Sequence, residues 1–498
     1  MTKQNSETKT TEHGPNGKGK TPPVDRAAID RDLAAEREQA TRQDAPADDY
    51  LLTLEADDAG NAEAVNRRHG DRFAYTVERG WLQYNGRHWD SDGAAAALRL
   101  AIVETLTARR HAAVSAGHRE ALIAAARPSA KHVRDALYIL EAQRTIAGAS
   151  FDADRHLLNC ANGVVDLRTG AIVAHNASQR FTYTLRTEYD PKADRSAWLT
   201  FLRGAVKGGD DVINWLQAWL GYCLTGDTRL DEMLYIYGPP RAGKGTLTGA
   251  LQALLGRPLS SEIAIATLTA KRSGDTQNFD LAPLKPARLI VCEESNNYES
   301  LNAGLVKRLT GGNVINAAYK GRDGFTYQPQ FKIVQVSNWP VKADPDDAAL
   351  WARLRVVEFP NSHADDPDKT MRDRMRTDAN LRGLLAWLID GARRFYESGA
   401  RGLIAPDAVK HATTKARDDL DTLAMWLAEL TDRKPGAWTS NADAYASYSA
   451  WCEANGAEPR HLQAFTRTLG GKGYATNQLR RHAGKVQRGI SDLALLDV

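Results

Sequence analysis

The stretch Met233-Leu-Tyr-Ile-Tyr-Gly-Pro-Pro-Arg-Ala-Gly-Lys-Gly-Thr246 decides how the middle of this 498-residue chain is interpreted. The apolar run 233–237 predicts a buried strand, and residues 247–255 predict a helix. Between them lies a glycine-rich turn whose backbone N–H groups can point inward at phosphates, made of Gly238, Pro239, Pro240, Arg241, Ala242 and Gly243. With the positive N-terminal end of the helix, this stretch predicts a phosphate-binding loop in which Lys244 reaches the β- and γ-phosphates.

One residue departs from the usual pattern of such loops. Gly245 stands where Ser or Thr normally binds magnesium, and Thr246 follows one position later. Nucleotide kinases also use Gly-Lys-Gly-Thr, so the variant is compatible with phosphate binding. Thr246 is the candidate magnesium ligand in the loop, and whether it touches the metal directly is left open.

Two further apolar segments each end in polar side chains. Residues 287–292 lead into Glu293 and Glu294; we expect Glu293 to hold magnesium and Glu294 to orient the attacking water. Residues 331–337 lead into Asn338, which can hydrogen-bond the γ-phosphate or that water if its strand lies between the other two. The alternatives are a solvated acidic turn after the first segment and a plain turn before Trp339-Pro340 after the second.

Two arginines follow this region, in Ala349-Leu-Trp-Ala-Arg353-Leu-Arg355. An arginine supplied across a subunit boundary stabilises charge on a transferring phosphoryl group. Arg353 is the first candidate for that role and Arg355 the second. The alternative is an ordinary arginine paired with an acid on a strand.

These elements, in this order, resemble the superfamily 3 helicases, and among them the phage and plasmid primase-helicases with their poxvirus relatives. The matching segments are GPPRAGKGT, LIVCEE, Lys307-Arg-Leu-Thr-Gly-Gly312, VQVSN and WARLR. The resemblance implies an α/β fold with an AAA+-like ATPase domain, a hexameric ring with ATP bound between subunits, and translocation along single-stranded DNA, typically 3′ to 5′.

The resemblance also implies a hairpin that enters the central channel, here near residues 319–325. Its expected DNA contacts are Lys320 and Arg322, flanked by Tyr319 and Phe325. An arginine common in the family just before this hairpin is absent, with Asn316-Ala-Ala318 in its place. A plain surface turn is the alternative.

The chain outside the motor is divided by composition and pattern. We expect a disordered tail over 1–47, a mostly helical N-terminal helicase-associated domain over 48–190, a helical collar over 191–228, the motor over 229–400 and a C-terminal domain over 401–498. Resemblance to the helicase-associated region rests on residues 60–63, 80–81, Trp89 and 157–167. The Asn85-Gly86 pair predicts a hairpin. No acidic triad typical of a primase is visible, so we expect no primase activity in this chain.

The C-terminal segment combines helices with a local excess of positive charge. Tyr445, Tyr448 and Trp451 share a helical face, a second helix over about 460–469 turns Phe465 and Leu469 inward, and residues 470–473 predict a turn. Seven basic residues and no acid lie between 459 and 490, namely Arg460, Arg467, Lys472, Arg480, Arg481, Lys485 and Arg488. All but Arg460 are candidate DNA contacts of a winged-helix domain. A solvated charged face is the alternative.

Composition sets further limits. The net charge is +3, so DNA affinity has to come from local basic surface. The four cysteines are scattered, without metal-ligand or disulfide spacing, and no segment has the apolar length of a membrane span. We therefore expect a cytoplasmic protein that contacts no membrane. The resemblance implies a bacterial host and the use of ATP and Mg²⁺.

The function expected from these observations is an ATP-dependent ring helicase in phage, plasmid or mobile-element replication. Its expected partners are single-stranded DNA, origin DNA, further copies of itself in a homo-hexamer and a separate primase. A small-molecule phosphotransferase is a rival suggested by Gly-Lys-Gly-Thr, but such enzymes need neither the paired glutamates nor a basic terminal domain. A nucleotide-dependent origin-binding initiator without processive unwinding is the other alternative.

Overall fold

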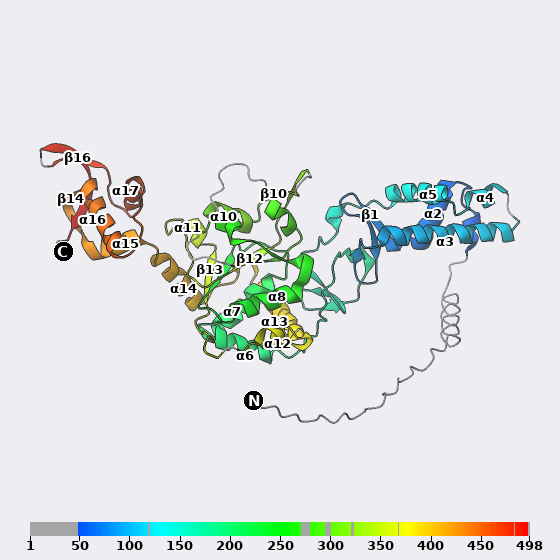
Figure 1. The fold of residues 1–498 in the computed structure, drawn as a ribbon, viewed down its shortest axis with the longest axis horizontal. Coiled ribbons are helices and arrows are strands. Elements are labelled where there is room, and N and C mark those ends of the chain that lie inside the picture. Colours follow the sequence, from blue (N-terminus) through cyan, green and yellow to red (C-terminus); the bar gives the residue numbers. More distant parts are fainter. Residues whose placement is uncertain are drawn as a thin grey trace, which may run out of the picture. The chain divides into compact units, whose positions relative to one another are not determined.

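The computed structural model describes residues 48–117, 120–269, 279–293, 300–319, 323–366, 368–482 and 484–496 (Figure 1). The predicted tail over 1–47 therefore lies outside the described residues. The chain forms two units, one of Met1–Gly70 with Ala96–Gln143 and one of Asp71–Ala95 with Arg144–Val498. No helix within the described ranges combines the length and the apolar character of a membrane span.

The smaller unit is helical and is organised around one buried arginine. It holds the 3-10 helix η1 (Asp48–Leu52), α2 (Asp58–His69), most of α3 (Ala94–Ser115), α4 (Glu120–Ala125) and α5 (Ala130–Gln143). The Arg109 guanidinium donates to Asn61 Oδ1 at 2.7 Å and to the carbonyl of Glu55 at 2.6 Å. A β-carbon at Gly60 would stand 2.1 Å from that same carbonyl, so this position requires glycine.

Two small antiparallel sheets precede the main one. The first contains β1 (Phe73–Thr76), β2 (Gly80–Tyr84) and β3 (Trp89–Asp90), and the second β4 (Leu157–Cys160), β5 (Gly163–Asp166) and β6 (Ile172–Val173). The predicted Asn85-Gly86 turn is confirmed between β2 and β3: the Asn85 side chain accepts from the N–H groups of Arg87 and His88 at 3.0 Å, and Gly86 has φ 92°.

The main sheet has five parallel strands in the order β13-β7-β12-β9-β8. These are β7 (Met233–Tyr237), β8 (Ser260–Glu262), β9 (Leu289–Glu293), β12 (Lys332–Ser337) and β13 (Leu354–Glu358). Their near-continuous apolar sequences are typical of strands covered on both faces. This arrangement confirms the expected α/β class, with a parallel sheet and helices.

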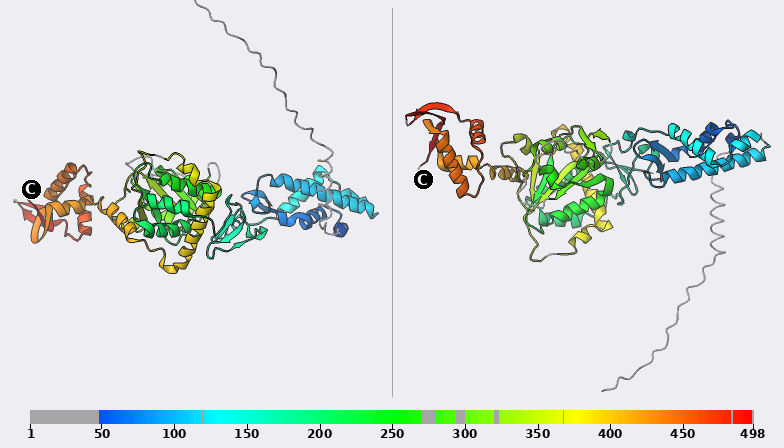
Figure 2. Two further views of the ribbon diagram at one scale, coloured as in Figure 1. Left: turned by 90° about the horizontal axis from the view of Figure 1, so that it is seen from below. Right: turned by 45° about the horizontal axis from the view of Figure 1, so that its top comes forward.

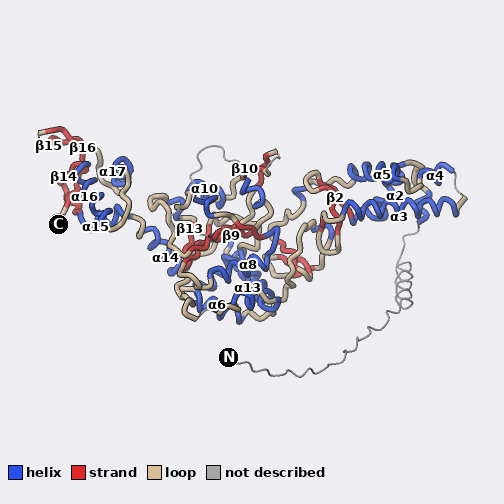
Figure 3. Tube along the Cα trace, in the orientation of Figure 1, coloured by secondary structure: helices blue, strands red, loops and turns tan. Residues whose placement is uncertain are grey.

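Alternate residues of these strands enter two different cores. Leu234 and Ile236 pack with α6 (Ser196–Ala205), α7 (Gly209–Tyr222), α8 (Lys244–Leu259) and α13 (Asp378–Glu397). Met233 and Tyr235 pack with α9 (Ile265–Thr269), η5 (Phe279–Leu284), α10 (Ala303–Thr310) and α11 (Ala348–Trp351). Figures 2 and 3 show the strands enclosed between these two groups of helices.

Helices α6 and α7 cover residues 196–222 within the segment that the sequence assigned to a collar. Three tryptophans of these helices are buried in the same core as β7, namely Trp198, Trp215 and Trp219. The Trp198 indole donates to the Asn380 carbonyl on α13 at 2.8 Å, and Trp219 donates to the Glu232 carboxylate at 3.1 Å. This segment is therefore a layer of the main α/β unit.

A lysine is buried at the start of the middle strand. The Lys332 ammonium donates to the carbonyls of Thr225, Gln330 and Asp227 and lies 4.6 Å from the centre of the Tyr222 ring. Burial lowers the pKa of Lys332 to about 7. The segment 225–227 that enters β7 is thus held against β12 by one side chain.

The C-terminal part begins with α14 (Asp407–Asp418), which packs on β13. It continues through α15 (Thr422–Leu430), β14 (Thr431–Ser440), α16 (Asn441–Ala454), α17 (Leu462–Gly471), β15 (Gln478–His482) and β16 (Lys485–Leu495). The three strands form an antiparallel sheet in the order β14-β16-β15. Tyr448, Phe465 and Leu469 are fully buried and Trp451 nearly so, as the sequence predicted, whereas Tyr445 is only partly buried.

The predicted turn at Gly470 was placed two residues too early. Gly470 and Gly471 continue α17, and the N–H of Lys472 closes onto the carbonyl of Thr468 at 2.9 Å. The helix also begins at Leu462, after an extended His461 with ψ 147°. Glycine lowers helix propensity, but the buried Phe465 and Leu469 hold the helix through both glycines.

Candidate functional site

The glycine-rich turn joins β7 directly to α8, as predicted from its sequence. Gly238 has φ 155°, and a β-carbon there would stand 1.9 Å from the Phe359 carbonyl on the neighbouring chain segment. Gly243 has φ 90° and begins the helix, while Arg241 also has a positive φ, 61°. Left-handed backbone at two of the turn residues bends the chain tightly enough to turn N–H groups inward.

Lys244 occupies the mouth of this turn. Its ammonium donates to the carbonyls of Gly238 at 2.6 Å and Pro239 at 2.8 Å, and to Asn338 Oδ1 at 3.0 Å. The residue is 6% exposed, and burial lowers the pKa of Lys244. Within the described ranges no carboxylate pairs with this ammonium, so its three acceptors are all neutral and an anion can replace them.

The strand order brings the predicted polar side chains together at the C-terminal ends of three adjacent parallel strands. Strand β12 lies between β7 and β9, with Ser337 opposite Tyr237 and Val336 opposite Glu293. The strand that ends in Asn338 thus lies between the other two, which was the condition for its expected role. Asn338 and Lys244 are 94 positions apart in the chain and are in hydrogen-bond contact in the fold.

A cleft of about 980 Å³ opens at this edge of the sheet. Lys244, Gly245, Thr246, Glu293 and Asn338 line one side of it. This volume falls at the upper end of small-molecule sites, which span roughly 300–1,000 Å³. Glu294 lies outside the described residues, so its predicted role stays a prediction.

Two oxygen-bearing side chains in the cleft suit a hard divalent cation. The Thr246 hydroxyl and the Glu293 carboxylate are ligands of the type that Mg²⁺ accepts in nucleotide sites, where it keeps several waters. Gly245 contributes no hydroxyl. The residues present therefore fit a magnesium ion bound by one carboxylate, the threonine hydroxyl and substrate oxygens.

The other side of the cleft was not predicted from the sequence. One face of α6, with Thr200 and Phe201, and the segment 363–375 after β13 complete the walls. A β-carbon at Gly243 would stand 2.9 Å from the Phe201 ring. No local signal in the sequence distinguishes Phe201, because only the docking of α6 places it beside the turn.

Arg353 and Arg355 lie near the N-terminal ends of the parallel strands, whereas Lys244 lies beyond their C-terminal ends. In the parallel pairing of β13 with β7, Leu354 stands opposite Met233, whereas the glycine-rich turn follows Tyr237 at the other end of β7. The Arg353 guanidinium donates to the Ala349 carbonyl at 2.8 Å and stays 3.8 Å from Asp231, while its Nε is buried without a partner. Neither arginine can reach the turn of its own chain.

Arg355 is already paired with an acid. Its guanidinium lies 2.6 Å from the Glu232 carboxylate, which also accepts from the Trp219 indole. Burial raises the pKa of Glu232. This pair joins β13 to the start of β7 in a largely buried environment, and the Nε of Arg355, like that of Arg353, is buried without a partner.

The loop that leads into Arg353 is held by contacts within the main α/β unit. Asp347 accepts from the Leu350 N–H at 2.9 Å and so caps α11, and it pairs with Lys307 of α10 at 2.9 Å. The Trp351 indole donates to the Asp344 carbonyl at 2.9 Å. These contacts determine where α11 begins, and Arg353 follows that helix by two residues.

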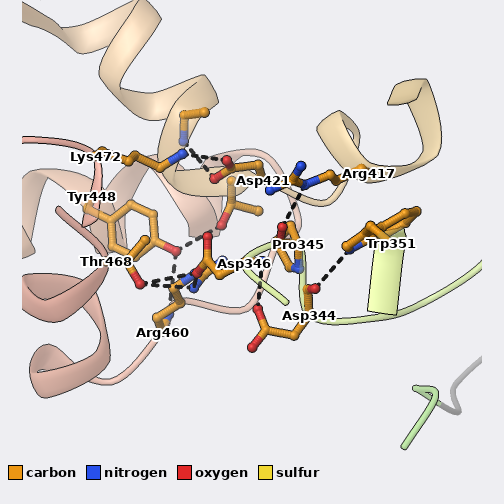
Figure 4. Close-up of polar contacts among 12 residues, drawn as sticks. Asp344, Pro345, Asp346, Trp351, Arg417, Asp421, Tyr448, Arg460, Thr468 and Lys472 are labelled. Atoms are coloured by element: carbon orange, nitrogen blue, oxygen red, sulfur yellow. Dashed lines mark hydrogen bonds and ion pairs between the residues drawn. The ribbon is translucent and has the colours of Figure 1, made fainter. Parts of the chain in front are cut away.

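The same loop also contacts the C-terminal part of the chain (Figure 4). Asp346 pairs with Arg460 and accepts from the Thr468 hydroxyl at 3.2 Å, while Arg417 donates to the Pro345 carbonyl at 2.7 Å. Lys472 pairs with Asp421 at 2.6 Å, next to these contacts. The loop before Arg353 therefore contacts both α14 and the α17 segment.

The predicted hairpin is present between β9 and β12. It consists of β10 (Ile315–Ala318) and β11 (Gly324–Tyr327), paired antiparallel with Ala318 opposite Gly324. The rings of Tyr319 and Phe325 stack with centroids 5.5 Å apart, and the Lys285 ammonium lies 5.3 Å from the Phe325 centroid. Lys320 and Arg322, which come between these two strands in the sequence, lie outside the described residues.

Most of the predicted basic residues of the C-terminal part are exposed. Arg467 is on the outer face of α17, and the β15–β16 hairpin carries Arg480, Arg481, Lys485 and Arg488. Leu479 and Val486 on the same hairpin are 69% and 67% exposed. Lys472 differs from this set because its ammonium is paired with Asp421.

Comparison with protein families matches two consecutive segments. Residues 62–206 match the family described as D5 N terminal like, and residues 236–353 match a family of unknown function, DUF5906. The second segment spans the glycine-rich turn, the hairpin and Arg353.

Curated relatives come from large DNA viruses. The chain is 24% identical over 332 residues to "Putative helicase L207/L206" of Acanthamoeba polyphaga mimivirus, covering 61% of this chain and 34% of that protein. It is 26% identical over 238 residues to "Putative helicase 022R" of Frog virus 3, covering 45% and 24%. The chain thus matches about a third or less of the length of these relatives.

Among solved structures, the apo structure of the NrS-1 C-terminal region aligns with 13% identity and a TM-score of 0.43, over 70% of this chain and 85% of that one. A score at this level does not establish a common fold. The family matches and the viral relatives lead to one conclusion. The chain is similar to the D5 N terminal like family over residues 62–206 and, over part of its length, to viral proteins named putative helicases.

Proposed function

We propose that this protein is an ATP-dependent replicative DNA helicase that assembles as a ring and moves along single-stranded DNA during replication of a phage, plasmid or mobile element. The observation on which this depends most is the hydrogen bond of 3.0 Å between Lys244 and Asn338. It joins a phosphate-binding type of turn to the strand beside Glu293, as ATP hydrolysis requires. The names of the viral relatives agree with a helicase role.

Lys244 and Asn338 provide a way to sense nucleotide. In the present structure the ammonium is engaged by Gly238, Pro239 and Asn338. A triphosphate in the cleft competes for the ammonium, because a charge-assisted hydrogen bond to phosphate is stronger than one to a neutral oxygen. The Asn338 amide is then released to bind the γ-phosphate or the attacking water.

A magnesium ion, bound by Thr246, Glu293 and phosphate oxygens, would supply charge neutralisation at the triphosphate. Glu294 is proposed to orient and polarise the attacking water. Arg353 is proposed to complete the site of a neighbouring subunit, because it lies at the end of the strands opposite the glycine-rich turn of its own chain. The expected assembly is therefore a homo-hexamer with ATP at the subunit boundaries and an AAA+-like motor in each subunit.

DNA contacts are proposed at two places. The β10–β11 hairpin offers the stacked rings of Tyr319 and Phe325 at the turn end of its ladder, which suits bases and backbone of a single strand. The C-terminal part offers α16 and α17 followed by an exposed basic hairpin, the element order of a winged helix binding duplex origin DNA. A separate primase would supply primers.

The test measures ATP turnover with and without single-stranded DNA and strand separation of a tailed duplex. We expect DNA-stimulated ATPase activity and unwinding in the wild-type protein, neither in Lys244→Ala, and ATP binding without unwinding in Glu294→Gln. Arg382→Ala is a matched control for loss of positive charge, because Arg382 pairs with Glu188 with both side chains about half exposed. Turnover that ignores DNA would instead support the small-molecule phosphotransferase.

The alternative function is a nucleotide-dependent initiator that binds origin DNA without processive unwinding. The exposed basic β15–β16 hairpin would serve either protein. Light scattering with and without ATP and single-stranded DNA separates the two in combination with the unwinding assay. A ring that binds duplex DNA but leaves tailed duplexes intact would identify an initiator.

A further inference from the structure

The short helix α12 (Met371–Met375) forms part of the cleft wall and packs on α8. Helix α12 follows β13, whereas α8 follows the glycine-rich turn after β7. The two helices are therefore far apart in the sequence and come into contact only in the folded chain. Figure 1 shows α12 on the same side of the sheet as α8 and α13.

Two arginines at the α12 segment lie over two glycines of α8. A β-carbon at Gly245 would stand 3.2 Å from Arg372 Nη2, and one at Gly249 would stand 2.0 Å from Arg376 Nη2. Residues four apart lie on the same face of a helix. The pair of glycines therefore forms a smooth strip along α8 that receives both guanidinium groups, with Arg372 nearer the N-terminus.

The surroundings of these arginines differ. Arg376 lies against the α8 backbone at Gly249. Arg374, between them, pairs with Asp368 at 3.0 Å and also donates to the Met371 sulfur. In the described part of the chain no carboxylate lies within ion-pair distance of Arg372, which faces the N-terminal turn of α8 and lines the cleft.

From this geometry we propose that Arg372 is a phosphate-contacting residue supplied by the same chain that supplies Lys244, and that Gly245 is glycine to leave room for its guanidinium. The inference rests on the proposed nucleotide function and extends it. It also explains the departure of the turn from the usual pattern: a side chain at 245 would occupy the space next to Arg372 Nη2.

The physical basis is the charge of the ligand. A magnesium-bound triphosphate retains negative charge that Lys244 alone does not offset, and the α8 N-terminus adds only a partial positive charge. A guanidinium over that N-terminus donates in a planar fork suited to phosphate oxygens. Arg372 would then act on the nucleotide from its own subunit, and Arg353 from the neighbouring one.

The test is equilibrium binding of Mg-ATP and Mg-ADP to the full chain by calorimetry, for the wild type, Arg372→Ala, Arg372→Lys and the control Arg382→Ala. We expect Arg372→Ala to weaken ATP binding about tenfold, the effect of losing one charge-assisted hydrogen bond. Arg372→Lys should recover part of the loss, and Arg382→Ala should bind as wild type. The melting temperature of the ligand-free variants should not change, because Arg372 is exposed.

A second comparison uses Gly245→Ser. Alone it should weaken ATP binding by displacing the Arg372 guanidinium, whereas in the Arg372→Ala background it should add little further loss, because the two residues act at one place. Additive losses would overturn the assignment, as would ATP binding by Arg372→Ala at wild-type affinity. A wild-type chain that binds no ATP would instead remove the proposed function, and this inference with it.

Discussion

Mixing two inactive variants tests whether Arg353 acts on the site of a neighbouring subunit. The perturbations are Lys244→Ala, which removes the ammonium at the turn, and Arg353→Ala, which removes the guanidinium at the other end of the sheet. The five residues of β7 separate these ends by about 16 Å, at 3.3 Å per residue, which is beyond the reach of an arginine side chain. Each variant alone should lose ATPase activity, Arg353→Ala by about 10³-fold or more.

An equal mixture should recover activity. A working boundary needs one subunit with an intact Lys244 and a neighbour with an intact Arg353. In a randomly mixed ring this occurs at about a quarter of the boundaries, so the mixture should reach up to about a quarter of wild-type turnover. The assay is steady-state phosphate release with single-stranded DNA, after the variants have been mixed without nucleotide and then incubated with ATP.

The matched control mixes Lys244→Ala with Asn338→Ala. These residues contact each other within one chain at 3.0 Å, so each variant inactivates the site of its own subunit. No site in the mixture then has both residues intact. If the first mixture is no more active than its separate components, or if the control mixture recovers equally, the assignment of Arg353 to a neighbouring site is wrong.

Three further predictions concern residues outside the cleft. Lys332→Met should lower the free energy of unfolding by about 3 kcal/mol in denaturant titrations, because three buried carbonyls lose their donor, and an unchanged midpoint would contradict this. Arg355→Met should destabilise the fold by about 3 kcal/mol by leaving Glu232 buried without its partner. Because burial raises the pKa of Glu232, the folded state favours the protonated carboxyl, so the destabilisation caused by Arg355→Met should grow as pH rises. A loss of turnover without a loss of stability would instead make Arg355 catalytic. Arg481→Ala should weaken duplex DNA binding and reduce the slope of log affinity against log salt by about one unit, whereas Lys410→Ala, on α14, should not.

The parts that were predictable from the sequence are those encoded in neighbouring residues. The apolar run ending at Tyr237, the glycines after it and the helix that follows all occur within one short segment. The same holds for the strands ending in Glu293 and Asn338, and for the Asn85-Gly86 turn. Strand periodicity and turn chemistry are local properties, so they can be recognised without knowledge of the fold.

Errors arose where packing overrides local preference. The glycines at 470 and 471 indicate a turn by propensity, yet they belong to α17 because Phe465 and Leu469 bury that helix. The role of Arg355 stays a prediction, and the fold adds what its position after Trp351 did not show, that it is paired with Glu232. Whether a charged side chain is free or paired depends on which segments the fold brings beside it.

By itself the sequence determined that the chain contains a phosphate-binding type of turn, strands with polar ends and a basic C-terminal hairpin. Only the tertiary structure decided that Asn338 touches Lys244, that Arg353 lies at the opposite edge of the sheet, and that Arg372 covers Gly245. The physical reason is the order of parallel strands, which is set by burial of both sheet faces over the whole domain. Contacts between residues a hundred positions apart follow from that order and from no local pattern.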